Sequence, residues 1–376
     1  MKNIVNFKTL LLCGVLLSGC LFVACSDDEE ESIPIQLTGI TTIDNFNASI
    51  TEAKLGDFIA IHGTGLDVHN IDSIRVNDVK VDMLEVYSEK SVLYMQVPVK
   101  LAIQETDKLY IYNKLGCKEL PLKTLAPDLK LTRMFNEYTM PGDTIMIYGD
   151  YFELYEIDAE NAVVDFNGKT SKVIDSGNNY LTAEVPEDVD KNIKVKVKGL
   201  KYNVESTCPG RYYDNECMIM DFDGLLPSNP IYVVTDPDDK QRLSGNFLRV
   251  DHTSEYSGWW YIAERGGVPF TDDMLDNYGD YVIKCEFRTA NQLIDGRIRF
   301  CNYLFWDAAP MEWVATDFTF QNFNRWETVT LPFKVNRSGT YTDNSYYHSF
   351  NMRLEIDPAI ARNFSFDNIR VCRKGD

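Results

Sequence analysis

The strongest constraint on the fold is an internal repeat in the first half of the chain. The segment LGDFIAIHGTGL at residues 55–66 is matched by PGDTIMIYGDYF at residues 141–152. Gly, Asp, Ile, Ile and Gly recur in the second segment at a constant spacing, so that Gly56 corresponds to Gly142. Two downstream segments also match, at slightly larger spacings. Since loops vary in length more readily than strands do, we infer two copies of one domain.

Each copy is predicted to be a small β-sandwich. Gly-Asp favours a turn, the alternating Ile-x-Ile places one face of a strand in a core, and the following glycine ends that strand. The pairs VN at residues 76–77 and NG at residues 167–168 predict tight hairpins, because Asn and Gly tolerate positive φ. With strands only, a copy of about 85–90 residues has the size of an immunoglobulin-like sandwich.

The order of these motifs resembles that of the immunoglobulin-like IPT/TIG domains. The pattern is GDxIxIxGxxL, then VN or FNG, then VP, and the resemblance covers residues 34–126 and 127–210. Pro34, Pro127 and Pro209 lie near the proposed boundaries and are expected to stiffen the joints. Domains of this kind occur in proteins of many functions, so the resemblance implies spacers rather than a site.

All five tryptophans lie beyond the repeat, within residues 218–376. Strand-like runs such as YVIKCEFR and FNMRLEI recur there without a helix-length amphipathic segment, which predicts one jelly-roll β-sandwich. The bounding strands of carbohydrate-binding jelly-roll modules resemble three segments of this region, namely MIMDFDG at residues 218–224, RWETVTLPF at residues 325–333 and FSFDNIRV at residues 364–371. The expected fold class is therefore all-β, with two immunoglobulin-like sandwiches followed by a jelly-roll carbohydrate-binding sandwich in an elongated chain.

Residues 1–25 have the layout of a lipoprotein signal peptide, with two lysines ahead of an apolar run that ends in cysteine. Cys25 is the preferred lipidation site and Cys20, in LSGC, is the alternative. The acidic linker at residues 26–33 resembles the signal that carries Bacteroidota lipoproteins to the outer face of the outer membrane. An ordinary secretory signal followed by a solvated acidic linker is the competing interpretation. Acyl chains supply membrane affinity without a spanning helix.

As a whole, the chain resembles the surface glycan-binding lipoproteins of Bacteroidota polysaccharide-utilisation loci. The resemblance implies a non-catalytic protein on the cell exterior that captures polysaccharide for an outer-membrane glycan transporter complex. A formal net charge of −20 and a pI near 4.6 exclude nucleic acid as a partner and suit a neutral polysaccharide. Which glycan is bound depends on the angles between aromatic rings, which the sequence does not give.

The adjacent pair Trp259 and Trp260 is the first candidate for glycan contact. Neighbouring side chains on a strand point to opposite faces, so the two rings cannot both enter one core. A flat ring can cover the C–H face of a sugar, whereas packing in a small satellite core is the alternative. A second cluster places Trp306 and Trp313 around a loop, where binding groups usually sit. Trp326 is assigned to packing.

Polar candidates follow from strand alternation. Arg297, Arg299 and Arg353 alternate with apolar residues, as do Asn351 and Glu355, so they are predicted on the wet face of their strands. Simple solvation of these side chains is the competing interpretation. The complete set of predicted glycan-binding residues is Trp259, Trp260, Glu264, Arg299, Tyr303, Trp306, Trp313 and Arg353.

Two other function classes are alternatives to glycan binding. A glycoside hydrolase needs two suitably spaced carboxylates, and Glu355 with Asp357 is the nearest candidate pair. Position 360 is Ile where a related hydrolase signature has a third carboxylate, so no enzyme activity is expected. A surface adhesin that binds protein partners is the other alternative, and it would mix exposed aliphatic residues with the tryptophans.

Metal and cysteine chemistry is sparse in the mature chain. No CxxC or Cys/His cluster occurs, which excludes the usual zinc sites. No cofactor is expected except a structural calcium ion, for which Asp221 and Asp223, with Asp367 and Asn368, could supply oxygen ligands. Cysteines 208 and 217 could form a disulfide, or they could be buried free thiols.

Overall fold

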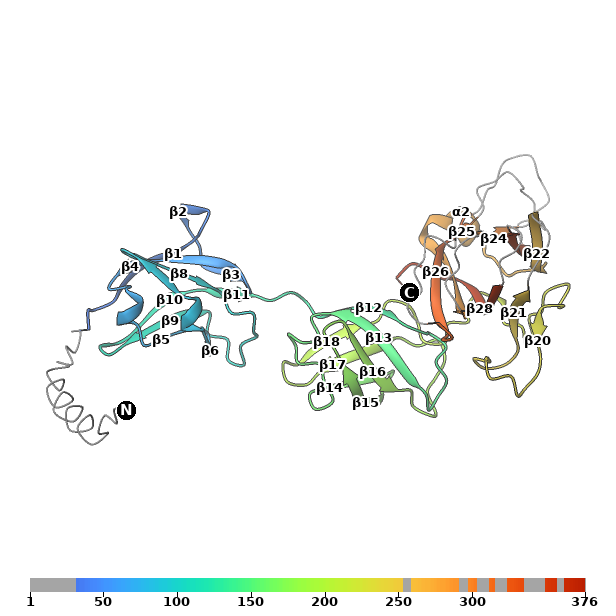
Figure 1. Cartoon of the computed structure of the whole chain (residues 1–376), viewed down its shortest axis with the longest axis horizontal. Helices are drawn as coiled ribbons and strands as arrows, with labels where there is room; N and C mark the ends of the chain where they lie inside the picture. Colours follow the sequence, from blue (N-terminus) through green and yellow to red (C-terminus); the bar gives the residue numbers. More distant parts are fainter. Residues whose placement is uncertain are drawn as a thin grey trace, which may run out of the picture. The chain divides into compact units, whose positions relative to one another are not determined.

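The computed structural model describes residues 32–252, 258–290, 297–302, 311–314, 323–334, 349–356 and 362–375. At positions 252, 258–261, 297–302, 311–314, 354–356 and 362 the description covers the backbone alone. The predicted signal peptide, with Cys20 and Cys25, and the acidic residues up to 31 lie outside the described residues. The chain divides into two units between Ala126 and Pro127, and nearly all of its regular structure is β (Figure 1).

The first unit is a β-sandwich with an aliphatic core. Its strands are β1 (Gln36–Thr42), β2 (Asn45–Ser49), β3 (Glu52–Lys54), β4 (Phe58–Thr64), β5 (Ser73–Val76), β6 (Val79–Lys80), β7 (Tyr87–Glu89), β8 (Val92–Gln96), β9 (Lys108–Asn113), β10 (Gly116–Pro121) and β11 (Lys123–Leu125). One sheet has the order β2-β1-β4-β8-β7, the other β10-β9-β5-β6, and β11 pairs with β3. Ile59, Ile61 and Ile74 are fully buried in the core, as the Ile-x-Ile pattern predicts.

The second immunoglobulin-like domain repeats this pairing. Its strands are β12 (Lys130–Met134), β13 (Thr144–Asp150), β14 (Ala162–Phe166), β15 (Lys169–Ser176), β16 (Tyr180–Glu184), β17 (Val195–Gly199) and β18 (Val204–Thr207). The ladder β12-β13-β16 corresponds to β1-β4-β8, and β14-β17-β18 corresponds to β5-β9-β10. Strand β15 pairs with both β14 and β16, so it combines the roles that β6 and β7 divide in the first unit.

The repeated Gly-Asp turns have the same geometry in both copies. Gly56 and Gly142 adopt φ values of 88° and 81°, a region that favours glycine. The amide of Gly56 donates to the carbonyl of Val97, and the amide of Gly142 donates to the carbonyl of Val185. These valines belong to the two VP motifs, so the turn and the distant VP segment form one structural element in each copy.

The C-terminal domain is a sandwich of two sheets. Its strands are β19 (Met218–Met220), β20 (Val233–Val234), β21 (Phe247–His252), β22 (Gly258–Arg265), β23 (Tyr281–Thr289), β24 (Arg297–Asn302), β25 (Met311–Val314), β26 (Glu327–Pro332), β27 (Phe350–Ile356) and β28 (Arg362–Arg373), with one short helix, α2 (Asp272–Asp276). One sheet has the order β20-β21-β28-β23-β26 with β19 beside β28, and the other has the order β22-β27-β24-β25. Their apolar faces enclose a core that includes Phe287, Phe350 and Phe366.

The outer face of the β20-β21-β28-β23-β26 sheet is buried against the second immunoglobulin-like domain. Arg370 and Glu286 on this face are fully buried and form an ion pair of 2.8 Å. Glu137, which follows β12, reaches across to Lys284 with an Nζ–Oε1 distance of 2.6 Å. These contacts explain why residues 127–376 form a single unit.

The cysteines with described side chains are free thiols, so the predicted disulfide between Cys208 and Cys217 is wrong. Both are buried, and burial raises the pKa of Cys208 to about 12 and that of Cys217 to about 11. The alternative of buried thiols that pack as small apolar groups is confirmed. Among the described residues, no helix combines the length and the apolar character needed to cross a membrane.

Candidate functional site

Most of the predicted glycan-binding residues belong to one sheet, β22-β27-β24-β25. Strand β22 carries Trp259, Trp260 and Glu264, whereas Tyr303 and Trp306 lie outside the described residues. The remaining predicted residues lie on the other three strands of the sheet, namely Arg353 on β27, Arg299 on β24 and Trp313 on β25. The fold therefore gathers onto one surface element residues that are widely separated in the sequence.

Backbone register separates the two adjacent tryptophans. Trp260 pairs with Leu354, Leu354 pairs with Ile298, and Ile298 pairs with Trp313. This row lies two positions along β27 from Met352, whose side chain is fully buried in the core. Because successive strand positions alternate between faces, the row that contains positions 260 and 313 belongs to the side of the sheet that faces the core.

The next row belongs to the opposite side of the sheet. Trp259 pairs with Glu355, and Glu355 pairs with Arg297 on β24. Register therefore places positions 259, 355 and 297 together, on the side away from the core. Glu355 is also one member of the carboxylate pair considered for hydrolysis, but Asp357 lies outside the described residues.

The same outward side of the sheet carries a second row, in which Arg299 and Arg353 were predicted from the sequence. Tyr261 pairs with Arg353, and Arg353 pairs with Arg299. Tyr261 was not among the predicted residues, although its alternation with Trp259 was the signal that could have found it. An aromatic residue and two arginines thus share one row beside Trp259.

Arg353 is covered rather than solvated. Its side chain is 6% exposed, and its Nε donates to Oδ1 of Asn351 at 3.0 Å. Asn351 is fully buried, and its Nδ2 has no hydrogen-bond partner among the described residues. The expectation that these two side chains are simply solvated is therefore wrong, and within the described part of the chain the Nδ2 donor of Asn351 is unused.

A β-bulge in β22 sets which residues face outward. The register shifts between Tyr261 and Ala263, and the consecutive residues Ile262 and Ala263 are both buried. A bulge inserts one residue and reverses the alternation that follows it. As a result Glu264 pairs with Asn351, and its partly buried side chain follows the outward row rather than the core.

Trp326 packs in the fold, and this prediction is confirmed. Its side chain is 9% exposed and makes an edge-to-face contact with Phe247 at a ring-centroid distance of 5.7 Å. The indole Nε1 donates to the carbonyl of Gln241 at 2.7 Å. Trp326 therefore provides an internal control for the tryptophans of the β22-β27-β24-β25 sheet.

The predicted calcium ligands lie near one another but do not form a complete site. Asp221 Oδ1 accepts three successive backbone amides, at 3.1, 3.0 and 2.7 Å. The buried Asp367 Oδ2 has no hydrogen-bond partner among the described residues. Burial raises the pKa of Asp367 well above its ordinary range, and Glu286, Asp223 and Asp221 add to the shift. No group of three His, Cys, Asp or Glu in the described part is arranged to hold a metal, so calcium stays a prediction.

Comparison with known family models gives a match in each of the last two domains. Residues 212–373 match the family model of the surface glycan-binding protein B xyloglucan binding domain. Residues 131–209 match the IPT/TIG domain, which confirms the resemblance for the second copy. A search of curated proteins found no match.

Two solved structures share the fold over most of this chain. One is the surface glycan-binding protein PbSGBP-B from Prevotella bryantii, with a TM-score of 0.58 and 18% identity, covering 91% of this chain and 99% of that chain. The other is an SGBP-B from a complex xyloglucan utilization locus in Bacteroides uniformis, with a TM-score of 0.51 and 15% identity, covering 91% of this chain and 100% of that chain. The chain thus has the fold of these two surface glycan-binding proteins.

Proposed function

We propose that this chain, whose C-terminal domain belongs to the surface glycan-binding protein B family, holds a neutral polysaccharide without cleaving it. The observation that carries the proposal is the family match over residues 212–373, which spans the whole β22-β27-β24-β25 sheet. Xyloglucan, the polysaccharide in the family's description, is the proposed ligand.

Trp259 is the proposed stacking residue of the adjacent pair. Its position belongs to the outward side of the sheet, in the row of Glu355 and Arg297, whereas the position of Trp260 belongs to the row that faces the core. A ring on the outward side can cover the C–H face of a sugar while hydroxyls reach polar groups at its rim. Tyr261 extends this aromatic surface along the same strand.

Arg299 and Arg353 are the proposed polar partners in the middle of the sheet, with Glu264 at the end of β22. Register places Tyr261, Arg353 and Arg299 in that order along one row, so Arg353 lies between the other two positions. Guanidinium groups offer several N–H donors in fixed directions, which suits neighbouring hydroxyls on one sugar ring. Tyr303 and Trp306, which follow β24 in the sequence, are proposed to extend the contact, whereas the position of Trp313 on β25 belongs to the row that faces the core.

The protein is proposed to act as a lipoprotein on the outer face of the outer membrane. Acylation at Cys25, or at Cys20, would supply the anchor, and the acidic run that follows would direct export. At that location the bound glycan would be passed to an outer-membrane glycan transporter complex. Replacement of SDDEEE by neutral residues should leave the protein inaccessible to protease added to intact cells. Unchanged cleavage in that variant would remove the acidic run from the proposal.

The test of glycan binding compares Trp259→Ala with Trp326→Ala in the mature chain. Trp259→Ala should weaken xyloglucan binding measured by calorimetry about tenfold to a hundredfold, since loss of an anchoring aromatic costs on the order of 1–3 kcal/mol. Trp326→Ala should instead lower thermal stability, because Trp326 packs in the fold. Unchanged affinity in Trp259→Ala would refute the stacking role. An increase in the reducing ends of xyloglucan during incubation with the protein would refute the proposal that the protein does not cleave its ligand.

A further inference from the structure

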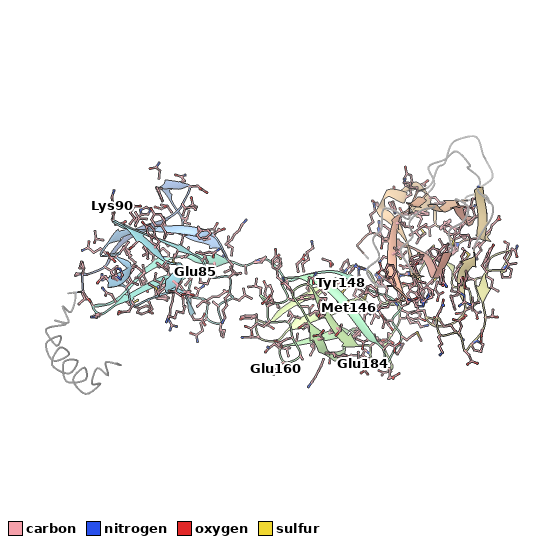
Figure 2. The ribbon with its side chains drawn as sticks, viewed as in Figure 1. Glu85, Lys90, Met146, Tyr148, Glu160 and Glu184 are labelled. Carbon is pink, nitrogen blue, oxygen red and sulfur yellow. The ribbon has the colours of Figure 1, made fainter. Side chains whose placement is uncertain are left out.

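A cavity lies between the second immunoglobulin-like domain and the C-terminal domain, within one unit of the chain. Its volume is about 350 Å³, and it is separate from the β22-β27-β24-β25 sheet. On the immunoglobulin-like side Met146 lines it from β13, beside Phe135, and Figure 2 labels Met146 near Tyr148. On the C-terminal side the lining comes from residues 240–243 and 324–326 together with Arg288.

The cavity gathers positive charge in a strongly acidic chain. Four cationic side chains line it, against the single carboxylate of Asp143. None of the four makes an ion pair with a carboxylate among the described residues. These cations are Lys240, Arg242, Arg288 and Arg325. Since the formal net charge of the chain is −20, four cationic side chains around one cavity are a local exception to the acidic character of the chain.

Arg288 is the buried member of this group. Its side chain is 8% exposed, and its two Nη atoms donate to neutral oxygens, Oε1 of Gln241 at 3.0 Å and Oδ1 of Asn324 at 2.8 Å. Burial lowers the pKa of Arg288, and the nearby Arg249 lowers it further, while Asp239 opposes the shift. Asp239 is itself paired with Arg249 at 2.7 Å. The buried guanidinium therefore has no carboxylate of its own, which is an unfavourable arrangement unless a ligand supplies one.

The walls of the cavity are fixed by contacts between the two domains. The amide of Thr328 donates to the carbonyl of Phe135 at 2.8 Å, which joins β26 to the immunoglobulin-like domain. The guanidinium of Arg325 lies 4.9 Å from the ring centroid of Phe135. The indole of Trp326 is held through the carbonyl of Gln241 at 2.7 Å. Aromatic surface and side-chain amides thus surround the cationic groups in a preorganised site.

We propose that this cavity binds a sugar that carries a carboxylate, that is, a uronic acid residue of an acidic glycan. Guanidinium groups recognise carboxylates through paired, charge-assisted hydrogen bonds, which are stronger than those to neutral oxygens. The amides of Gln241, Asn324 and Asn136 suit sugar hydroxyls. This site is additional to the proposed site for neutral polysaccharide and does not depend on it.

The first experiment titrates the mature chain with glucuronate and with trigalacturonate, using glucose as the neutral comparison. Binding of the acidic sugars but not of glucose is expected, and added salt should weaken it because exposed cations contribute. Absence of uronate binding would overturn the proposal. Equal binding of inorganic phosphate would also overturn it, since the site would then recognise charge without sugar. Tighter binding of polyglutamate than of trigalacturonate would point to an acidic protein segment and would contradict it as well.

The second experiment uses the double variant Lys240→Gln with Arg325→Gln. Neither side chain makes an ion pair in the described part of the chain, so the fold should persist with only the loss of the Arg325–Phe135 contact, and a melting temperature close to that of the parent protein checks this. Uronate affinity should fall about tenfold or more, since two charge-assisted contacts are removed. The xyloglucan affinity of the double variant should equal that of the parent protein. If the parent protein itself does not bind xyloglucan, that result counts against the proposed neutral-polysaccharide site and not against this cavity. Lys108→Gln, in an exposed pair of the first unit, is the matched control and should leave uronate affinity intact.

Discussion

Arg370 of the C-terminal domain and Glu137 of the second immunoglobulin-like domain form a buried ion pair, with an Nη2–Oε2 distance of 2.7 Å. The same guanidinium binds Glu286 at 2.8 Å through Nη1, and it lies 4.7 Å from the ring centroid of Tyr138. Lys284 completes the network through the second oxygen of Glu137. Each domain thus compensates charge that the other buries, which couples the immunoglobulin-like domain to the glycan-binding domain as one body.

The first prediction is that Glu137→Gln strongly destabilises this body. Removing one partner leaves Arg370 buried with part of its charge uncompensated, which typically costs about 3–5 kcal/mol. Chemical denaturation of the mature chain should show the loss in the transition of residues 127–376. The first unit, which ends at Ala126, should unfold as in the parent protein.

The matched control for Glu137→Gln is Glu119→Gln, because Glu119 pairs with Lys108 at 2.6 Å on the surface. Both side chains of this pair are more than a third exposed, at 42% and 51%. Exposed pairs contribute little to stability because solvent screens their charges, so the control should unfold almost as the parent protein does. Similar losses of unfolding free energy in the two variants would show that the buried network stabilises the protein no more than an exposed ion pair does.

A second prediction concerns the glycine that ends the repeated strand. A Cβ at Gly63 would lie 2.0 Å from the carbonyl oxygen of Gln36, and one at Gly149 would lie 2.4 Å from that of Lys130. Both contacts are with backbone, so the strands would have to separate. Either glycine-to-alanine change should cost about 3 kcal/mol in unfolding free energy, whereas Gly224→Ala, where a Cβ meets nothing within 4 Å, should be nearly neutral. Thermal unfolding that ranks Gly224→Ala with the other two would contradict this.

Local turn chemistry was readable from the sequence because it depends on neighbouring residues. Asn77 and Asn167 adopt φ values of 55° and 57°, as the VN and FNG hairpins require. The Gly-Asp turns and the alternating isoleucines likewise follow from local sterics and period. Most of the fold could therefore be predicted from residues whose conformation is decided within a few positions.

Contacts between distant segments were not readable in this way. Glu137 and Arg370 are separated by 233 positions, and nothing near either residue indicates the other. Which of Trp259 and Trp260 shares a row with the core depends on the register between β22 and β27. The cationic cavity was hidden for the same reason, since its arginines come from separate strands and loops and the acidic composition of the chain argues against them.

A third prediction concerns calcium. Asp367 Oδ2 is buried without a hydrogen-bond partner in the described part of the chain, and Asp221 and Asp223 influence its pKa. A calcium ion there would offset the repulsion among these carboxylates, as oxygen ligands of this type bind it. Calcium should therefore raise the melting temperature, a chelator should lower it, and Asp223→Asn should abolish the response. An identical melting temperature with calcium and with chelator would remove the ion from consideration.

The last prediction is the dependence of stability on pH in the presence of a chelator. Burial, with Glu286 opposite it on β23, raises the pKa of Asp367 well above 3.8. Between that ordinary value and the raised one, the folded state holds a proton that the unfolded state has released. The stabilising contribution of protonated Asp367 is therefore fully present at a pH below its ordinary pKa, and it is lost as the pH rises through its raised pKa in the folded state. The melting temperature should accordingly fall as pH rises from about 4 towards neutral.

Two variants with opposite expected signs test this assignment. Asp367→Asn removes one carboxyl group with a raised pKa but leaves another, since burial also raises the pKa of Glu286 to about 7, so it should make the pH profile shallower and raise the melting temperature at neutral pH. Asp165 has the opposite behaviour, because a hydrogen bond from Lys198 lowers its pKa below 3.8, and its stabilising contribution is present at neutral pH and lost on acidification. Asp165→Asn should therefore destabilise the protein at neutral pH and have less effect in acid. If Asp367→Asn instead melts lower than the parent protein at neutral pH with chelator, Asp367 is compensated by a partner and the raised pKa is wrong.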